Sequence, residues 1–214
     1  VEAFVQAAKR AERAGFDVVE LHAAHGYLLS EFLSPVSNLR EDEYGGSAEN
    51  RMRFPLRVAQ ALRDAWPRDR ALGARFNGSD WVEEGVSADE VQTFARALYA
   101  MGYDYLHLSS GGNVATAQIP GREPGYQLPF AEGVKQAVPE ATVVAVGMIA
   151  DPHQAEAVLQ AGQADMVAVA RALLDDANWG HHAAVALGAD EDLPRQYQMA
   201  SQKIWPGYAL AHKD

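Results

Sequence analysis

The stretch AGFDVVELHAAHGY, residues 14–27, predicts a buried strand and shows where polar side chains gather at its end. Gly15 stands where helices commonly end, and Asp17–Leu21 is a short apolar run containing β-branched residues, as buried parallel strands have. The run ends in His22, His25 and Tyr27. A glycine followed shortly by an aspartate recurs as MGYD and AGQAD, so we predict a repeated helix-to-strand turn.

Helix-like and strand-like segments alternate along the whole chain. We predict strands at Asp17–Leu21, Ala71–Phe76, Tyr105–Ser109, Thr142–Val146 and Met166–Val169, and helices at 1–14, Ala48–Trp66, Ala88–Met101, Phe130–Val138, Pro152–Ala161 and Trp179–Leu187. Residues 22–47 are predicted to be a long loop. Regular alternation implies an α/β protein with a parallel sheet, and both a doubly wound sheet and a (β/α)8 barrel fit it.

Polar residues concentrate just after the predicted strands. In a barrel these positions form the carboxyl-terminal face, where active sites lie. A barrel needs eight strand–helix units, and this chain supplies only the last five or so. We therefore expect residues 1–214 to be the C-terminal part of a single barrel, with the N-terminal units outside this sequence, because the helical pattern is already under way at Val1.

Composition excludes several classes of function. The 214-residue chain has a formal net charge of -11 and no cysteine. An acidic chain without a basic run binds nucleic acid and anionic membranes poorly, and a chain without cysteine has no disulfide or thiolate metal site. No apolar run approaches the roughly 18 residues of a membrane span. We predict a cytoplasmic protein with no nucleic-acid or membrane partner.

The cluster His22, His25 and Tyr27 is the first candidate site. Two imidazoles and a phenol at a strand end can bind a carbonyl oxygen and deliver a proton. The alternative is that both histidines are half-buried structural residues. A metal site is weaker, because the spacing is not that of a zinc-binding HExxH helix and no third ligand is evident.

Arg75 is the second candidate, because it lies inside the apolar strand ALGARF. An arginine there must pair with a buried carboxylate or face a ligand, and the sequence leaves both open. The long segment 32–54 is likewise either a functional loop or a surface loop that ends at Ser47 as a helix N-cap.

Glycines and an arginine follow the later strands, at Gly111, Gly147–Met148 and Ala170–Arg171. Loops after the last two strands of a barrel are the usual phosphate site. Backbone N–H groups and an arginine fork suit a phosphate dianion, so these residues are the predicted cofactor-phosphate site.

These segments together resemble a known family. The block AGFDVVELHAAHGYLLSEFLSPVSNLREDEYGGSAENRMRF, residues 14–54, closely resembles the signature of the Old Yellow Enzyme family of FMN-dependent ene reductases. The segments ARFNGSDW, YDYLHLSSGG, VVAVGMI and ADMVAVARALLDD follow in the family's order, and PGYQLPFA and QYQMA resemble its thermophilic-like bacterial subgroup.

The resemblance implies a (β/α)8 barrel with FMN, NAD(P)H as reductant and an activated alkene as substrate. By resemblance, His22 and His25 bind the substrate's carbonyl or nitro oxygen and Tyr27 is the proton donor. Arg75 matches the arginine at the flavin N1/O2 edge, and Gly147 with Ala170–Arg171 matches the phosphate site. The family usually has glycine where this chain has Ala170.

Further expectations concern partners and rival functions. The active unit needs the N-terminal barrel half, in the same protein or on a second chain, and the related enzymes suggest a homo-oligomer. A flavin-free, phosphate-binding aldolase or isomerase is the first rival, although Lys9, Lys135, Lys203 and Lys213 all fall in predicted helices or the tail. A non-catalytic barrel fragment is the second.

Overall fold

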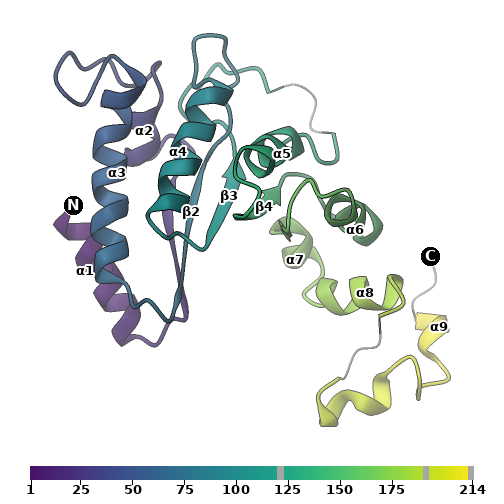
Figure 1. Cartoon of the computed structure of the whole chain (residues 1–214). Coiled ribbons are helices and arrows are strands. Elements are labelled where there is room, and N and C mark those ends of the chain that lie inside the picture. The colour runs from purple at the N-terminus through teal and green to yellow at the C-terminus, as the bar shows by residue number, and fades with distance from the viewer. Residues whose placement is uncertain (120–122, 190–192, 212–214) are drawn as a thin grey trace. The chain divides into compact units, whose positions relative to one another are not determined.

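The computed structural model describes residues 1–119, 123–189 and 193–211. The chain forms two compact units (Figure 1). The first unit contains Val1–Ala150 and Gln154–Val169, and the second contains Asp151–His153 and Ala170–Asp214. All five strands belong to the first unit, so the sheet and its site can be described within it.

The first unit is built on a five-stranded parallel sheet. Its strands are β1 (Val18–Ala23), β2 (Ala71–Asn77), β3 (Tyr105–Ser109), β4 (Thr142–Val146) and β5 (Met166–Ala168), and they lie side by side in chain order. A doubly wound sheet reverses its strand order part-way, whereas a barrel keeps neighbours in sequence. The order therefore decides between the two predicted architectures in favour of the barrel.

The six predicted helices are present, and the structure adds four short ones that were not predicted, α2, α7, η1 and α9. In chain order the helices are α1 (Glu2–Arg13), α2 (Leu28–Leu33), α3 (Ala48–Ala65), α4 (Ala88–Ala100), α5 (Leu128–Ala137), α6 (Pro152–Gln160), α7 (Arg171–Asp175), α8 (Trp179–Ala186), the 3₁₀ helix η1 (Arg195–Ala200) and α9 (Tyr208–Ala211). The prediction of an unbroken loop over residues 22–47 is wrong, because α2 lies within it. Six residues are too few to show a helical period.

The two faces of the sheet differ in character. Leu21, Leu72, Leu106 and Val143 occupy one face and are at most 2% exposed, which makes that face part of the apolar core. Side chains alternate along a strand, so the residues between them point to the other face. We call this the polar face; its members are Val18, Glu20, His22, Ala71, Gly73, Arg75, Asn77, Tyr105, His107, Ser109, Thr142, Val144, Val146, Met166 and Ala168.

Local hydrogen bonds begin the helices and fold the segment that precedes α3. Ser47 accepts a hydrogen bond from the backbone of Asn50, as the sequence predicts for an N-cap. Ser87 and Glu90 form a reciprocal capping box at the start of α4. Asn38 donates to the carbonyl oxygens of Phe32 in α2 and of Tyr44 in its own loop, so this loop is held to α2 by specific bonds.

Candidate active site

Three polar rings gather where β1 ends. His22 lies in β1, and His25 and Tyr27 lie in the turn between β1 and α2. The ring of His22 lies between the others, with centroid distances of 5.2 Å to His25 and 5.2 Å to Tyr27. Tyr27 is 64% exposed. The structure therefore brings the three predicted residues together, with the phenol open to a small molecule.

Two neighbouring strands hold His25 in an uncommon backbone conformation. His25 has φ of 64°, and its backbone N–H donates to Asn77 Oδ1 at 3.2 Å. Its Nε2 lies 2.7 Å from Ser109 Oγ. A non-glycine residue in the left-handed region persists only where its surroundings determine it. The β2 and β3 side chains thus orient this imidazole.

Both histidines are held uncharged at neutral pH. Burial, followed by the charge of Arg75, lowers the pKa of His22 below its usual value. Burial and the charges of Arg75, His22 and His107 lower the pKa of His25 to about 4. A neutral imidazole presents one N–H donor and one lone pair, so these rings suit hydrogen bonding to a ligand oxygen.

Two glycines bring the turn after β1 against the loop after β3. Gly26 has φ of +75°, and a Cβ added there would lie 2.2 Å from the carbonyl oxygen of Gly112. A Cβ added at Gly112 would lie equally close to the carbonyl carbon of His25, at 2.2 Å. Any larger residue at either position would separate the two backbones. The position of the ring cluster therefore depends on both loops.

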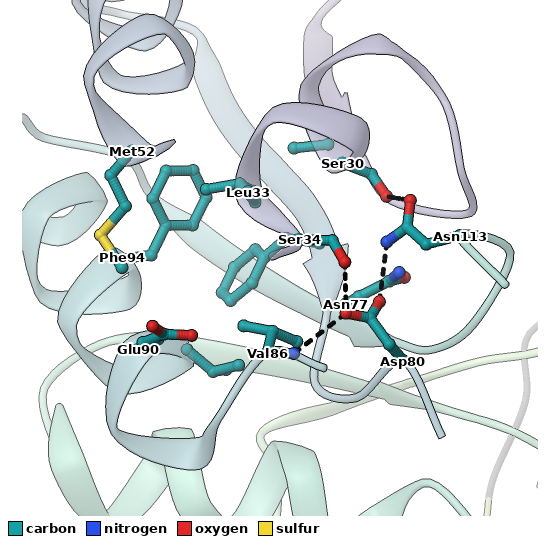
Figure 2. Close-up of a pocket in the computed structure, with 13 residues that line it drawn as sticks. Ser30, Leu33, Ser34, Met52, Asn77, Asp80, Val86, Glu90, Phe94 and Asn113 are labelled. Atoms are coloured by element: carbon teal, nitrogen blue, oxygen red, sulfur yellow. Dashed lines mark hydrogen bonds between the residues drawn. The ribbon is translucent and has the colours of Figure 1, made fainter. Parts of the chain in front are cut away.

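A buried carboxylate beneath the turn ties several loops together (Figure 2). Asp80, which is 1% exposed, accepts hydrogen bonds from Ser34 Oγ at 2.7 Å, from Val86 N–H at 3.0 Å and from Asn113 Nδ2 at 2.7 Å. Ser30 Oγ donates to Asn113 Oδ1 at 2.9 Å and accepts a hydrogen bond from the backbone N–H of Gly26. The turn that carries the polar rings is thus fixed to the loop after β2.

Arg75 lies on the polar face directly beside His22, because their Cα atoms are register partners in β1 and β2. Among the residues that the structure describes, no carboxylate lies within ion-pair distance of its guanidinium. Its Nε is buried and finds no partner among them, and Nη2 reaches Ser109 Oγ only at 3.5 Å. Of the two alternatives, the ligand-facing arginine agrees with this geometry and the buried ion pair does not.

The predicted phosphate residues fall in both units. In the first unit Gly111 has φ of +77°, donates its N–H to Ser79 O at 2.9 Å and accepts from Asn77 Nδ2 at 2.8 Å. Gly147 and Met148 follow β4 with φ of 122° and 55°. The role of these three residues in cofactor binding stays a prediction.

Ala170 and Arg171 lie in the second unit, where Ala170 precedes α7 and Arg171 is its first, exposed residue. Ala170 has φ of -129°, which is open to any L-residue, so alanine in place of glycine causes no left-handed strain here.

Sequence reasoning missed one part of the polar face. His107 is 7% exposed, and its Nδ1 lies 3.0 Å from Glu20 Oε2. Alternation alone puts both residues on the face that carries His22 and Arg75, so the strand pattern contained this signal. Pairing the two residues required the strand register.

The rival chemistries find less support in the structure. Lys9 lies in α1, Lys135 in α5 and Lys203 in the turn after η1, so no strand of the described residues ends in a lysine; Lys213 lies outside the described residues. Within the described ranges no group of three or more histidine, aspartate or glutamate side chains is arranged to hold a metal ion. No described helix is long and apolar enough to cross a bilayer.

A sequential parallel sheet with polar side chains at its carboxyl end is the arrangement of a (β/α)8-barrel enzyme. The model of the NADH:flavin oxidoreductase / NADH oxidase family matches residues 1–189, and the chain belongs to this family. It is 44% identical over 201 residues to an NADPH dehydrogenase of Geobacillus thermodenitrificans (strain NG80-2), covering 92% of this chain and 57% of that protein. The chain thus spans little more than half the length of the curated relatives it matches.

Solved structures agree with the family and the fold. A complex of 2-naphthoyl-CoA reductase with 2-naphthoyl-CoA matches with a TM-score of 0.78 and 29% identity, covering 88% of this chain and 29% of that one. Morphinone reductase matches with a TM-score of 0.70 and 32% identity, covering 90% of this chain and 50% of that one. The predicted fold class is confirmed: the five strands are part of a (β/α)8 barrel.

Proposed function

We propose that this chain forms the substrate-binding and FMN-phosphate part of a flavoenzyme that uses NAD(P)H to reduce the C=C bond of α,β-unsaturated carbonyl or nitro compounds. The observation that carries the proposal is the meeting of His22, His25 and Tyr27 with the unpaired guanidinium Nε of Arg75 at one end of the sheet. Family membership and NADPH dehydrogenase relatives support the redox chemistry.

Each polar group has a proposed task. The neutral imidazoles of His22 and His25 donate hydrogen bonds to the carbonyl or nitro oxygen of the substrate, which polarises the conjugated alkene and stabilises the charge that develops on that oxygen. The exposed hydroxyl of Tyr27 delivers the proton to the α-carbon. Bound FMN would supply the hydride.

Arg75 fits the pyrimidine edge of a flavin. A flavin gains negative charge at this edge on reduction, and a guanidinium favours the charged form. No carboxylate among the described residues pairs with its guanidinium, which leaves the charge of Arg75 available to such a ligand. In the first unit, Gly111, Gly147 and Met148 are proposed to contact the cofactor. A phosphate-binding role for Ala170 and Arg171 is proposed for the second unit by itself.

The catalytic unit is proposed to be larger than this chain. In the described residues β1 and β5 each pair on one side only, so the sheet has two open edges. We use the term completed barrel for this chain together with the strands and helices that close its sheet, on the same polypeptide or on a second one. We also propose that the completed barrel is a cytoplasmic homo-oligomer, which gel filtration with light scattering tests.

The test is flavin binding followed by turnover. The completed barrel, purified and mixed with FMN, should retain a visible flavin spectrum after desalting and should oxidise NADPH when an α,β-unsaturated ketone is added. The chain alone, with its sheet open, should retain no flavin. A completed barrel that retains none would refute the proposal.

Three substitutions distinguish a catalytic role of the completed barrel from a non-catalytic one. Tyr27→Phe should slow alkene reduction by about 10²-fold or more, the usual contribution of a general acid, while flavin reduction by NADPH stays near wild type. His22→Ala and His25→Ala should raise the KM for the ketone. Tyr44→Phe, at a half-buried position in the loop before α3 and away from the polar face, is the matched control. Unchanged turnover in all three would favour a non-catalytic role.

A further inference from the structure

A hydrogen-bonded cluster on the polar face lies beside Arg75 and is not used by the proposed chemistry. His107, the register partner of Arg75, has its Nδ1 3.0 Å from Glu20 Oε2, and the Tyr105 side chain is a further group that lowers the pKa of Glu20. Gly73 makes this possible, because a Cβ there would lie 2.0 Å from Tyr105 Cζ. The tyrosine ring therefore crosses β2 at the one position where the strand has no side chain, and reaches the glutamate on β1.

The cluster keeps Glu20 negatively charged. Burial alone would raise the pKa of Glu20, but the hydrogen bond and charge of His107, the Tyr105 hydroxyl and the charge of Arg75 outweigh it, and the pKa is lowered. Among the described strand residues of the polar face, Glu20 has the only carboxylate. Its negative charge is within electrostatic range of the guanidinium of Arg75.

His107 faces both the carboxylate and the arginine strand. A carboxylate accepts but does not donate, so the nitrogen that faces Glu20 carries a proton. The His107 side chain is 9% exposed, and its Nε2 is buried with no partner among the described residues. The Nε of Arg75, at the paired position on the neighbouring strand, is also buried and has no hydrogen-bond partner among the described residues. The Glu20–His107 pair thus lies on the same face of the sheet as Arg75, with His107 at the paired position on β3.

We propose that the Glu20–His107 pair partly offsets the charge of Arg75, and so sets how strongly the protein prefers reduced over oxidised FMN. This inference rests on the proposed function of Arg75. A guanidinium beside a flavin favours the more negative, reduced form, and a carboxylate near that guanidinium weakens the preference. The consequence is a lower reduction potential than Arg75 alone would produce, and hence a stronger hydride donor.

The test compares the two oxidation states of bound FMN in the completed barrel. In Glu20→Gln, the dissociation constant for oxidised FMN divided by that for reduced FMN should rise about tenfold, which for a two-electron couple is a potential about 30 mV more positive. Glu20→Asp keeps the charge and should stay near wild type. Glu49→Gln, which removes a carboxylate whose side chain is 85% exposed on α3, is the control. A Glu20→Gln potential equal to that of the control would overturn the inference.

A second variant protects the test against a folding failure. His107→Phe removes a hydrogen-bond donor from Glu20 and leaves Tyr105 and Arg75 as the groups that face it, with His22 beside it on β1. The pKa of Glu20 then rises. The reduction potential should shift in the same direction as in Glu20→Gln, but by less. A purely structural role would weaken binding of both oxidation states alike and leave their ratio unchanged, which would also refute the inference. If wild-type protein binds no FMN, the proposed function itself fails.

Discussion

Replacing Asp80 by asparagine tests whether the buried network below the ring cluster holds the site in place. Oδ2 of Asp80 accepts from Ser34 and from the backbone of Val86, and Oδ1 accepts from Asn113 (Figure 2). An asparagine has one oxygen. With that oxygen toward the pair of donors, its NH₂ group faces the NH₂ group of Asn113. Turning the Asn113 amide over relieves this contact but takes the acceptor from Ser30.

At least one hydrogen bond to a charged group is lost whichever way the amides turn, and one buried donor is left without an acceptor. A hydrogen bond to a charged group contributes about 1.5–3 kcal/mol, and an unsatisfied buried donor costs about 1–3 kcal/mol. Because the two contributions overlap, we expect Asp80→Asn to lower the free energy of unfolding by about 2–4 kcal/mol. The turn that carries His25 and Tyr27 loses its anchor, so kcat for alkene reduction should fall about tenfold or more.

Urea unfolding of the completed barrel, followed by circular dichroism, measures the stability change, and steady-state kinetics with the ketone measures the loss of turnover. Asp42→Asn is the matched control, because the ion pair of Asp42 with Arg40 is exposed and an asparagine can still accept from the Tyr44 backbone, so both readouts should stay unchanged. A stability loss below about 1 kcal/mol in Asp80→Asn would refute the idea that this carboxylate is a buried anchor.

Three further predictions concern the same unit. Gly26→Ala should cost about 1–3 kcal/mol more in urea unfolding than Gly46→Ala, because both glycines have positive φ but only Gly26 faces backbone at 2.2 Å; equal costs would contradict the loop contact. Since the pKa of His25 is lowered from 6.5 to about 4, the unfolded chain binds the extra proton first. Stability should therefore fall as pH drops from 6.5 towards 4, and less steeply in His25→Asn, as measured by thermal melts; parallel curves would count against it. Arg51→Met removes a cation that is 6% exposed and pairs with a carboxylate of α4, and should lower the unfolding free energy by about 3–5 kcal/mol, with partial recovery in Arg51→Lys.

Much of the fold could be predicted from local patterns. The bounds of β3 and β4 agree with the prediction, and those of the other strands differ by no more than two residues at either end. The reason is that buried parallel strands are short apolar runs between glycines and polar caps, and both signals are local. Helix α2 was missed because one and a half turns between two polar segments carry no measurable period.

The candidate site was only partly predictable. His22, His25, Tyr27 and Arg75 could be singled out as candidates because ring and charged side chains are unusual at the ends and in the middle of apolar strands. The Asp80 network was not found, because its partners come from loops far apart in the chain. Their proximity depends on tertiary packing, which a local pattern does not encode.

By itself, then, the sequence determined the order of strands and helices, the parallel α/β class and the resemblance to a flavin oxidoreductase family. Only the tertiary structure decided the sequential strand order that distinguishes a barrel from a doubly wound sheet. It also decided the left-handed backbone of His25, the contact of Gly26 with Gly112, and the pairing of Glu20 with His107. Each of these depends on strand register and on contacts between loops that are distant in sequence. The register is fixed only when the strands pair, because the paired sheet must bury one face of every strand.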